Sequence, residues 1–341
     1  MHCPRVDHFV KIVPPVFGAT KVFTLCCHMD KPPRFNSYDE LMNSEWLKDV
    51  RVKFANDEFP KECNRCKQPE ELNLHSVRHS AIETHKQQTK SDYLIADLVL
   101  DNICNGGCQF CTPYLSTKLG SLSSNDYFMF SNVDNYNNLP LDRIVQLDIS
   151  GGEPSNSKNG KALLSNLPIN VKKIRINTNA SGFIDELVDV IDKGIEVEVT
   201  ISFDGVGSVY EYVRWPVTWN KFLKTVEKYK QFKKEHPSLV SLNFWSTVNA
   251  LNINDFENII QFAKDNEVSH GFSLLSTPSQ LSLSFQNELT MSAKEKLANS
   301  SDPNIQGILP MLASGPNNQQ EFDTFVNAQD KLRGISISSY I

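Results

Sequence analysis

The chain has 341 residues, of which 40% are hydrophobic and 22% are charged, and its formal net charge is −6. This length and composition predict one large globular domain with room for a smaller one. The net negative charge gives no general electrostatic reason to bind nucleic acid or an anionic membrane surface. No apolar run is long enough to span a bilayer and the N-terminal residues lack the apolar stretch of a secretory signal, so the sequence predicts a cytoplasmic protein.

Residues 1–90 are rich in cysteine, proline and charge, and they show little periodicity. One helix is predicted near Tyr38–Ala55, where apolar residues recur on one face. A segment this small is hard to stabilise by core burial alone, so we expect a metal centre to help hold it as a small separate domain.

From Tyr93 onward, short apolar runs alternate with amphipathic stretches, which predicts an α/β protein with a parallel sheet built from βα units. Six strands are expected, at Leu94–Leu100, Ile144–Ile149, Lys173–Asn177, Val197–Phe203, Leu242–Val248 and Gly271–Leu275. Helical faces are expected around Ile184–Ile191, Phe222–Tyr229 and Phe256–Ala263. Periodicity alone leaves open whether these strands form an open sheet or a partial barrel. We place this core at residues 91–280 and a helical tail at 281–341, with helices at Ser292–Ala298 and Gln319–Lys331.

All eight cysteines lie in the first third of the chain: Cys3, Cys26, Cys27, Cys63, Cys66, Cys104, Cys108 and Cys111. Close spacing without a secretion signal favours metal ligation over disulfides. The last three form a C-x3-C-x-aromatic-C motif directly after a predicted strand, with no fourth cysteine nearby. Three thiolates on a cubane iron–sulfur cluster leave one iron open to a ligand that can receive an electron. The alternative is a zinc site completed by a distant ligand.

A second motif, Ser150-Gly151-Gly152-Glu153-Pro154, follows the next predicted strand. Two glycines at a strand end expose backbone groups to a ligand, and Glu153 would place a carboxylate there that suits an ammonium group. Taken alone, this motif is often only a tight strand-to-helix turn.

Together the two motifs resemble those of the radical S-adenosylmethionine (SAM) superfamily. In that superfamily the cysteine motif ligates a [4Fe–4S] cluster, the Gly-Gly-Glu-Pro turn binds the amino group of SAM, and the fold is a partial (β/α)6 barrel. The resemblance implies that one electron cleaves SAM to methionine and a 5′-deoxyadenosyl radical, which takes a hydrogen atom from the substrate. It also implies an electron donor such as flavodoxin or ferredoxin.

The same resemblance implies further SAM contacts at the carboxyl ends of the strands. It assigns backbone groups of Phe110 to the adenine and polar side chains at later strand ends to the ribose and carboxylate. The positions concerned are Phe110, Asn177, Asn179, Ser202, Asp204, Arg214 and Asn249. The Ser-x-Asp-Gly turn with a downstream arginine is similar to that of the subfamily that modifies peptides and proteins. For Arg214 the alternative is a surface ion pair.

The remaining cysteines resemble the auxiliary-cluster segments called SPASM or twitch domains. Gly18, a strand-like stretch at residues 22–25 and then Cys26-Cys27 are similar to the first part of their pattern, and Cys63-x2-Cys66 after a helix is similar to the rest. Cys3 could supply a fourth thiolate. Which of the adjacent pair is a ligand stays open, and four thiolates suit zinc equally well. The order departs from the usual one, because the segment precedes the predicted barrel.

The sequence therefore predicts a radical SAM enzyme with a second iron–sulfur cluster, acting on a peptide or protein. A small-molecule substrate such as a nucleotide or sugar is the alternative within that class. A zinc-stabilised binding protein without catalytic activity is the alternative outside it. Neither nucleic acid nor a membrane is expected as a partner.

Overall fold

The protein is described by a computed structural model that covers residues 1–15, 20–123 and 128–341. Its centre is an eight-stranded sheet in the order β2-β1-β3-β4-β5-β6-β7-β8. All neighbouring strands are parallel except β1 and β2, which pair antiparallel. The sheet stays open between its edge strands β2 and β8, so the prediction of an α/β partial barrel is confirmed.

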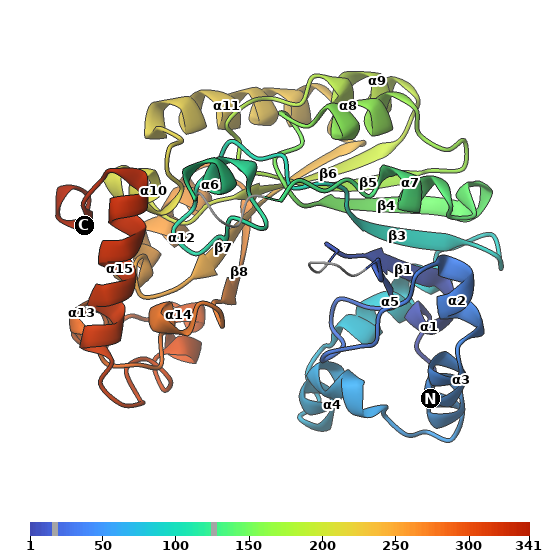
Figure 1. Cartoon of the computed structure of the whole chain (residues 1–341), viewed down its shortest axis with the longest axis horizontal. Coiled ribbons are helices and arrows are strands. Elements are labelled where there is room, and N and C mark those ends of the chain that lie inside the picture. The colour runs from blue at the N-terminus through green and yellow to red at the C-terminus, as the bar shows by residue number, and fades with distance from the viewer. Residues whose placement is uncertain (16–19, 124–127) are drawn as a thin grey trace.

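All six predicted strands are present in the predicted order. They are β3 (Leu94–Val99), β4 (Ile144–Ser150), β5 (Lys173–Thr178), β6 (Glu196–Ser202), β7 (Val240–Val248) and β8 (Ser269–Leu274). Figure 1 shows α8 (Lys158–Ser165), α9 (Glu186–Asp192) and α11 (Trp219–Glu235) along one face of the sheet. In α12 (Phe256–Asp265) the predicted apolar face is buried, whereas in α9 Val188 is 43% exposed and lies off the buried face.

The N-terminal segment adds two strands to the sheet, of which the sequence predicted only the one directly before Cys26. Strand β1 (Phe9–Ile12) runs parallel to β3, and β2 (Phe23–Thr24) forms the edge. Lys11 lies opposite Asp97 in the ladder, and Lys11 Nζ is 2.7 Å from Asp97 Oδ2. The unpredicted strand β1 has only four residues, which are too few for an alternating pattern to be seen.

The single helix predicted near Tyr38–Ala55 is two helices, α2 (Tyr38–Asn43) and α3 (Glu45–Ala55). Ser44 between them has extended backbone angles, and its hydroxyl accepts a hydrogen bond from Leu47 N at 3.2 Å. A serine that caps the following helix in this way ends the preceding one. The other N-terminal helices are α1 (Arg5–His8), α4 (Asn64–Glu71) and α5 (Val77–Lys86), and Gly18 lies outside the described residues.

Between the strands lie α6 (Thr117–Leu122), α7 (Val133–Asn137) and α10 (Ser208–Val213). The predicted helical tail is confirmed as α13 (Glu288–Leu297) and α15 (Gln319–Arg333), with the unpredicted α14 (Pro303–Ile308) between them. Tyr212 of α10 packs in one buried cluster with Phe322 and Val326 of α15.

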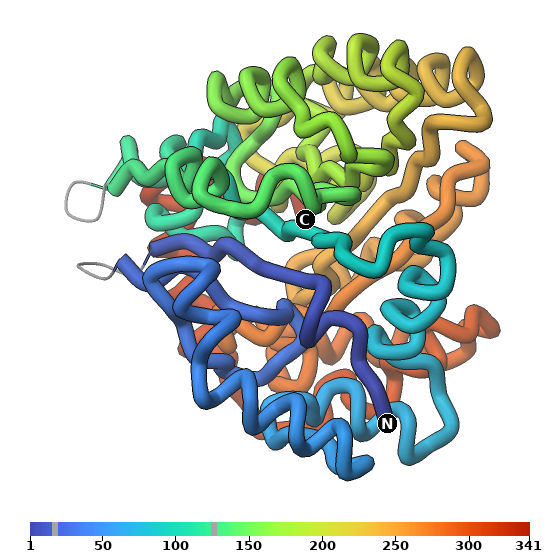
Figure 2. The backbone as a smooth tube through the Cα atoms, turned by 90° about the vertical axis from the view of Figure 1, so that its right-hand side faces the viewer, coloured from blue at the N-terminus to red at the C-terminus, as the bar shows by residue number. Residues whose placement is uncertain are grey.

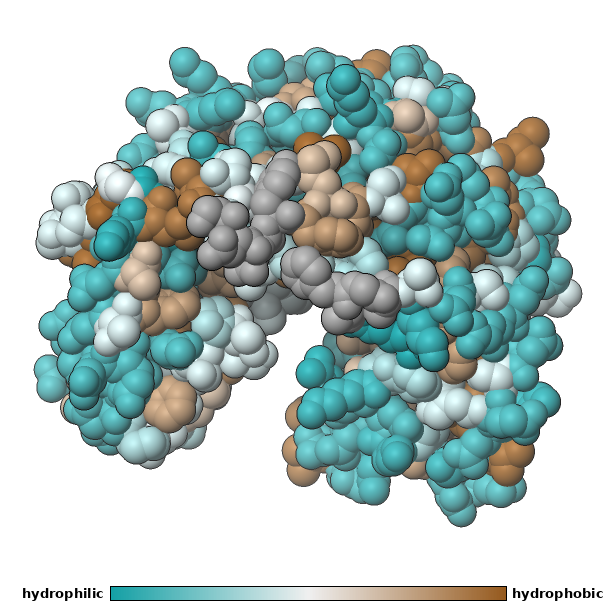
Figure 3. Space-filling view, viewed as in Figure 1, coloured by the Kyte–Doolittle hydropathy of each residue, from teal (hydrophilic) through white to brown (hydrophobic). Residues whose placement is uncertain are grey.

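The N-terminal helices and the C-terminal helices lie on the side of the sheet opposite α8, α9 and α11, here called the inner face (Figures 1 and 2). Figure 3 shows a hollow between these two groups. Among the described residues, no helix is long and apolar enough to cross a membrane.

Candidate active site

A cavity of about 460 Å³ lies at the carboxyl ends of β3 to β6. Parallel sheets place their binding sites at this edge, because the loops that leave the strands meet there. Most of the predicted site residues line the cavity: Cys104, Cys108, Phe110, Cys111, Gly151, Gly152, Glu153, Asn177, Asn179, Ser202 and Arg214. Asp204 and Asn249 are not among the lining residues.

The cysteine loop is held in place by backbone hydrogen bonds to the end of α10 and to the segment that follows it. Gly107 N donates to Trp215 O at 2.6 Å, and Gln109 N donates to Val213 O at 3.0 Å. A Cβ atom on Gly107 would lie 2.8 Å from the Trp215 ring, so this glycine allows the loop to pack against the indole.

The three thiols line the cavity, and two of them accept hydrogen bonds from nearby N–H groups. Gly106 N donates to Cys104 Sγ at 3.3 Å, and Arg214 Nη1 donates to Cys108 Sγ at 3.7 Å. Burial raises the pKa of Cys111 to about 12 and also raises the pKa of Cys104. Loading a thiolate-bound metal would therefore release protons here.

These side chains fit an iron–sulfur cluster by their chemistry, because buried thiolates with nearby N–H donors are the usual environment of such clusters. In the part of the chain that is described, no group of three or more His, Cys, Asp or Glu side chains is arranged to hold a metal ion.

The Gly-Gly-Glu-Pro turn lies directly against the backbone that leads into the cysteine loop. Gly152 N donates to Asp101 O at 2.9 Å, and Glu153 N donates to Ile103 O at 2.7 Å. Gly151 has a φ of 123°, and a Cβ atom on Gly152 would lie 2.2 Å from Ile103 O. Both glycines are therefore required by the close approach of two backbone segments.

Glu153 is almost fully buried, and its carboxylate is held by hydrogen bonds from the protein itself. It accepts bonds from Thr178 Oγ1 at 2.7 Å, from Asn179 N at 2.7 Å and from Ser155 Oγ at 2.8 Å. Burial nevertheless raises the pKa of this carboxyl above its usual range. Glu153 thus ties the end of β5 to the turn after β4 as well as lining the cavity.

Arg214 is paired, but the pair is buried rather than on the surface. Its side chain is 11% exposed, and its Nε donates to Asp204 Oδ2. Asp204 also accepts a hydrogen bond from Thr247 N at 2.6 Å, and burial raises the pKa of its carboxyl. The Arg214 guanidinium carbon lies 5.6 Å from the centre of the Phe110 ring. Asp204 therefore acts on the cavity through Arg214.

Asn249 is fully buried in the loop after β7, where its own side chain stabilises the turn. Its side-chain nitrogen donates to Thr247 O at 2.8 Å, and its side-chain oxygen accepts from Leu251 N at 3.0 Å. These bonds keep the amide inside the loop and away from the cavity.

The N-terminal cysteines surround a separate cavity, which Cys3, Cys26, Cys63 and Cys66 line and Cys27 does not. Cys27 is exposed. Arg5 Nη1 donates to Cys26 Sγ at 3.4 Å, and the hydrogen bond from Cys27 together with Arg5 lowers the pKa of Cys26 to about 7.

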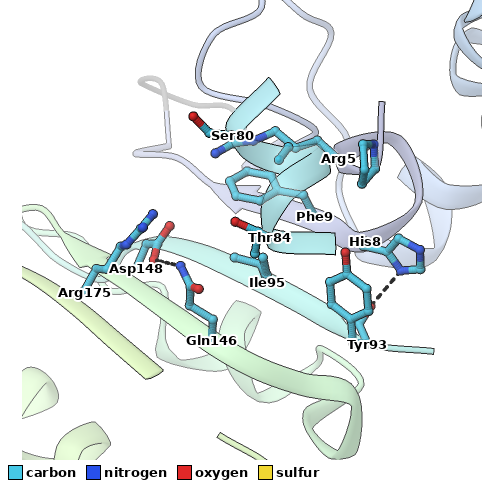
Figure 4. Close-up of a pocket in the computed structure, with 12 residues that line it drawn as sticks. Arg5, His8, Phe9, Ser80, Thr84, Tyr93, Ile95, Gln146, Asp148 and Arg175 are labelled. Atoms are coloured by element: carbon cyan, nitrogen blue, oxygen red, sulfur yellow. Dashed lines mark hydrogen bonds between the residues drawn. The ribbon is translucent and has the colours of Figure 1, made fainter. Parts of the chain in front are cut away.

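A row of charged residues crosses the inner face, and the sequence analysis missed it. Lys11, Asp97, Asp148, Arg175 and Glu198 occupy adjacent register positions on neighbouring strands. Figure 4 shows Asp148 bonded to Gln146 beside Arg175, in a cavity that Arg5 and His8 also line. Charged residues inside otherwise apolar strands were the available signal, because a buried parallel strand is normally apolar throughout.

Comparison with known proteins agrees with this geometry. Residues 98–263 match the family model described as the Radical SAM superfamily. Among solved structures, Streptococcus suis SuiB bound to precursor peptide SuiA is 13% identical, with 74% of this chain and 58% of that chain covered and a TM-score of 0.41. Native anSMEcpe with bound AdoMet is 15% identical, with 71% of this chain and 62% of that chain covered and a TM-score of 0.40.

The radical SAM methyltransferase TsrM from Kitasatospora setae, with cobalamin and a [4Fe–4S] cluster bound, is 13% identical, with 53% and 37% covered and a TM-score of 0.38. This chain thus covers less than two thirds of the length of each of these structures. No curated relative matches the chain. The family match includes the cysteine loop, the Gly-Gly-Glu-Pro turn and Arg214. Residues 98–263, just under half of the chain, are therefore assigned to a radical SAM domain.

Proposed function

We propose that this chain reductively cleaves SAM and takes a hydrogen atom from a peptide or protein substrate. The observation that carries the proposal is the meeting of the three thiols, the Gly151–Gly152 turn and the buried Arg214 in one cavity. A [4Fe–4S] cluster on Cys104, Cys108 and Cys111 would supply the electron for SAM cleavage, with SAM on the open iron.

The residues of this chain provide orientation at that site. Arg214, fixed by Asp204 and aimed at the cysteine loop, suits the carboxylate of SAM because a guanidinium fork matches a carboxylate. Glu153 is held rigid by its donors and presents a carboxylate edge to the ammonium group. The adenosine would lie against the remaining wall of the cavity, which is lined by Phe110, Asn177, Asn179 and Ser202.

The shape and chemistry of the inner face support a peptide or protein substrate. The hollow in Figure 3 is open to solvent and gives an extended chain access to this side of the sheet. Trp245 lies directly across from Ser202 of the cavity and is 45% exposed, so it offers an aromatic surface beside the site. The row of charged residues from Lys11 to Glu198 can pair with backbone and side-chain groups of such a chain.

For residues 1–90 we propose a domain similar to a SPASM or twitch domain, which holds a second iron–sulfur cluster on Cys3, Cys26, Cys63 and Cys66. The exclusion of Cys27 from their shared cavity supports this choice of four thiols. Thiolates persist in a reducing compartment, so we propose that the protein works in the cytoplasm with a flavodoxin or ferredoxin as electron donor.

Anaerobic reconstitution tests the proposal. We expect about eight iron atoms per chain, four for each cluster. Dithionite and SAM should then yield 5′-deoxyadenosine, measured by chromatography. Binding of zinc in place of iron, with no SAM cleavage under these conditions, would rule out the proposed function.

Replacing Cys63 with alanine should remove about half of the iron and leave SAM cleavage that is no longer coupled to product formation. The reason is that Cys63 lines only the N-terminal cavity. The matched control is Cys27→Ala, which removes a neighbouring thiol outside that cavity and should keep the full iron content. Equal iron loss in both variants would contradict the assigned four-thiol set.

A further inference from the structure

The last residue of the C-terminal helix α15, Arg333, reaches the cysteine loop. Its Nε donates to Gly107 O at 2.6 Å, and its Nη2 donates to Cys108 O at 2.8 Å. Its Nη1 donates to the backbone and side-chain oxygens of Gln329, at 3.0 Å and 2.7 Å. The guanidinium therefore holds two consecutive carbonyl groups of the loop with its planar fork. Arg333 is only 6% exposed, although it comes from a tail in which the sequence showed no motif.

A second set of bonds fixes α15 against the same loop. Tyr212 Oη donates to Asp330 Oδ1 at 2.8 Å, and Gln109 Nε2 donates to Tyr212 O at 3.2 Å. Asp330 also accepts a hydrogen bond from Ile337 N at 2.7 Å, after the chain turns back at Gly334 with a φ of 67°. The loop, α10 and α15 are thus joined through side chains that are buried, so Arg333 has a defined position.

This arrangement places positive charge beside the cysteine ligands. Cys108 contacts two guanidinium groups, since Arg214 donates to its sulfur and Arg333 to its carbonyl oxygen. The carbonyl oxygens of Gly107 and Cys108 both accept hydrogen bonds from Arg333, so the negative ends of these two dipoles point toward the guanidinium. A buried positive charge stabilises an added electron nearby, and the surroundings of the cysteine sulfurs tune the potential of an iron–sulfur cluster.

We propose that Arg333 is a positioning residue which fixes the backbone at Gly107 and Cys108 and raises the reduction potential of the cluster on Cys104, Cys108 and Cys111. This inference rests on the proposed function for the presence of that cluster. The positioning part concerns the chain itself and can be measured without iron.

The first test compares Arg333→Gln with Lys331→Gln, which removes the same charge from an exposed position on the same helix. Midpoint potentials of the reconstituted proteins are measured by dye titration followed with electron paramagnetic resonance. In Arg333→Gln we expect cluster reduction to become about tenfold less favourable, which for one electron is a potential about 59 mV lower. Lys331→Gln should keep the wild-type potential. An unchanged potential in Arg333→Gln, or an equal shift in both variants, would overturn the assigned effect.

The second test uses protein without iron, and it separates this inference from the proposed function. Hydrogen exchange of the peptide that spans residues 104–111 should become faster in Arg333→Gln and stay at the wild-type rate in Lys331→Gln. Unchanged exchange in both variants would overturn the positioning role. Wild-type protein that takes up no iron would instead overturn the proposed function and the potential shift.

If Arg333→Gln does not fold, the variant Arg333→Lys is measured in its place. It keeps the charge but cannot hold two carbonyls with a fork, so we expect a potential near that of the wild type and faster loss of iron to a chelator. Iron retention equal to that of the wild type in this variant would argue against the fork.

Discussion

Replacing Cys108 with alanine should reduce SAM cleavage to the background rate and leave about half of the iron bound. Two remaining thiolates cannot hold a cubane cluster with one open iron, whereas the N-terminal cavity keeps its four thiols. The change removes one sulfur from a half-buried position that faces a cavity, so the fold should persist. The measurements are 5′-deoxyadenosine by chromatography, iron per chain, and a thermal unfolding curve.

Cys27→Ala is the matched control for this experiment as well, because it also removes one thiol and should keep full cleavage. Cleavage by Cys108→Ala at the wild-type rate would reject the assignment of this cysteine to the SAM cluster.

Replacing Gly152 with alanine should destabilise the protein by about 3 kcal/mol and prevent SAM binding. The new Cβ atom would lie 2.2 Å from Ile103 O, and the obstacle is backbone that cannot move aside without releasing the bond from Glu153 N. The turn after β4 and the cysteine loop would then separate. Urea unfolding and equilibrium binding of SAM to the reconstituted protein measure the two effects.

Gly307→Ala provides the control, because nothing lies within 4 Å of the position that its Cβ atom would take in α14. Alanine is the better helix former, so this variant should gain about 0.5–1 kcal/mol of stability. If Gly152→Ala lost no stability relative to the wild type, as expected for Gly307→Ala, the close approach of the two backbone segments would be contradicted.

The sequence predicted the strands of the core well, because most of them carry closely spaced or alternating apolar residues that differ from the helical spacing of the segments between them. It also predicted which loops meet, since Cys104 and Gly151 each follow a parallel strand and the carboxyl ends of such strands share one edge. What it could not predict was how individual side chains are used. Glu153 and Asp204 accept hydrogen bonds from residues of later strands, and only the folded chain brings Thr178 and Thr247 to them.

Arg333 illustrates the limit most clearly. It is more than two hundred residues from the carbonyl groups that it holds, as its separation of 226 from Gly107 shows. No local pattern in the tail distinguishes it from a basic residue that favours the C-terminal end of a helix. The short strand β1 was missed for a different reason, because its place in the sheet depends on pairing with the core strand β3 rather than on its own sequence.

The pairing of β1 with β3 also sets the spacing of the two cysteine sites. Cys3 precedes β1 and Cys26 follows the antiparallel β2, so both lie near the amino end of β1, whereas Cys104 follows the carboxyl end of the parallel β3. Pro14, just beyond β1, lines the cavity at the carboxyl ends of β3 to β6. Strand β3 has six residues, which at about 3.3 Å per residue is roughly 20 Å. A molecule that reached both cysteine sites at once would therefore have to extend along the length of β3.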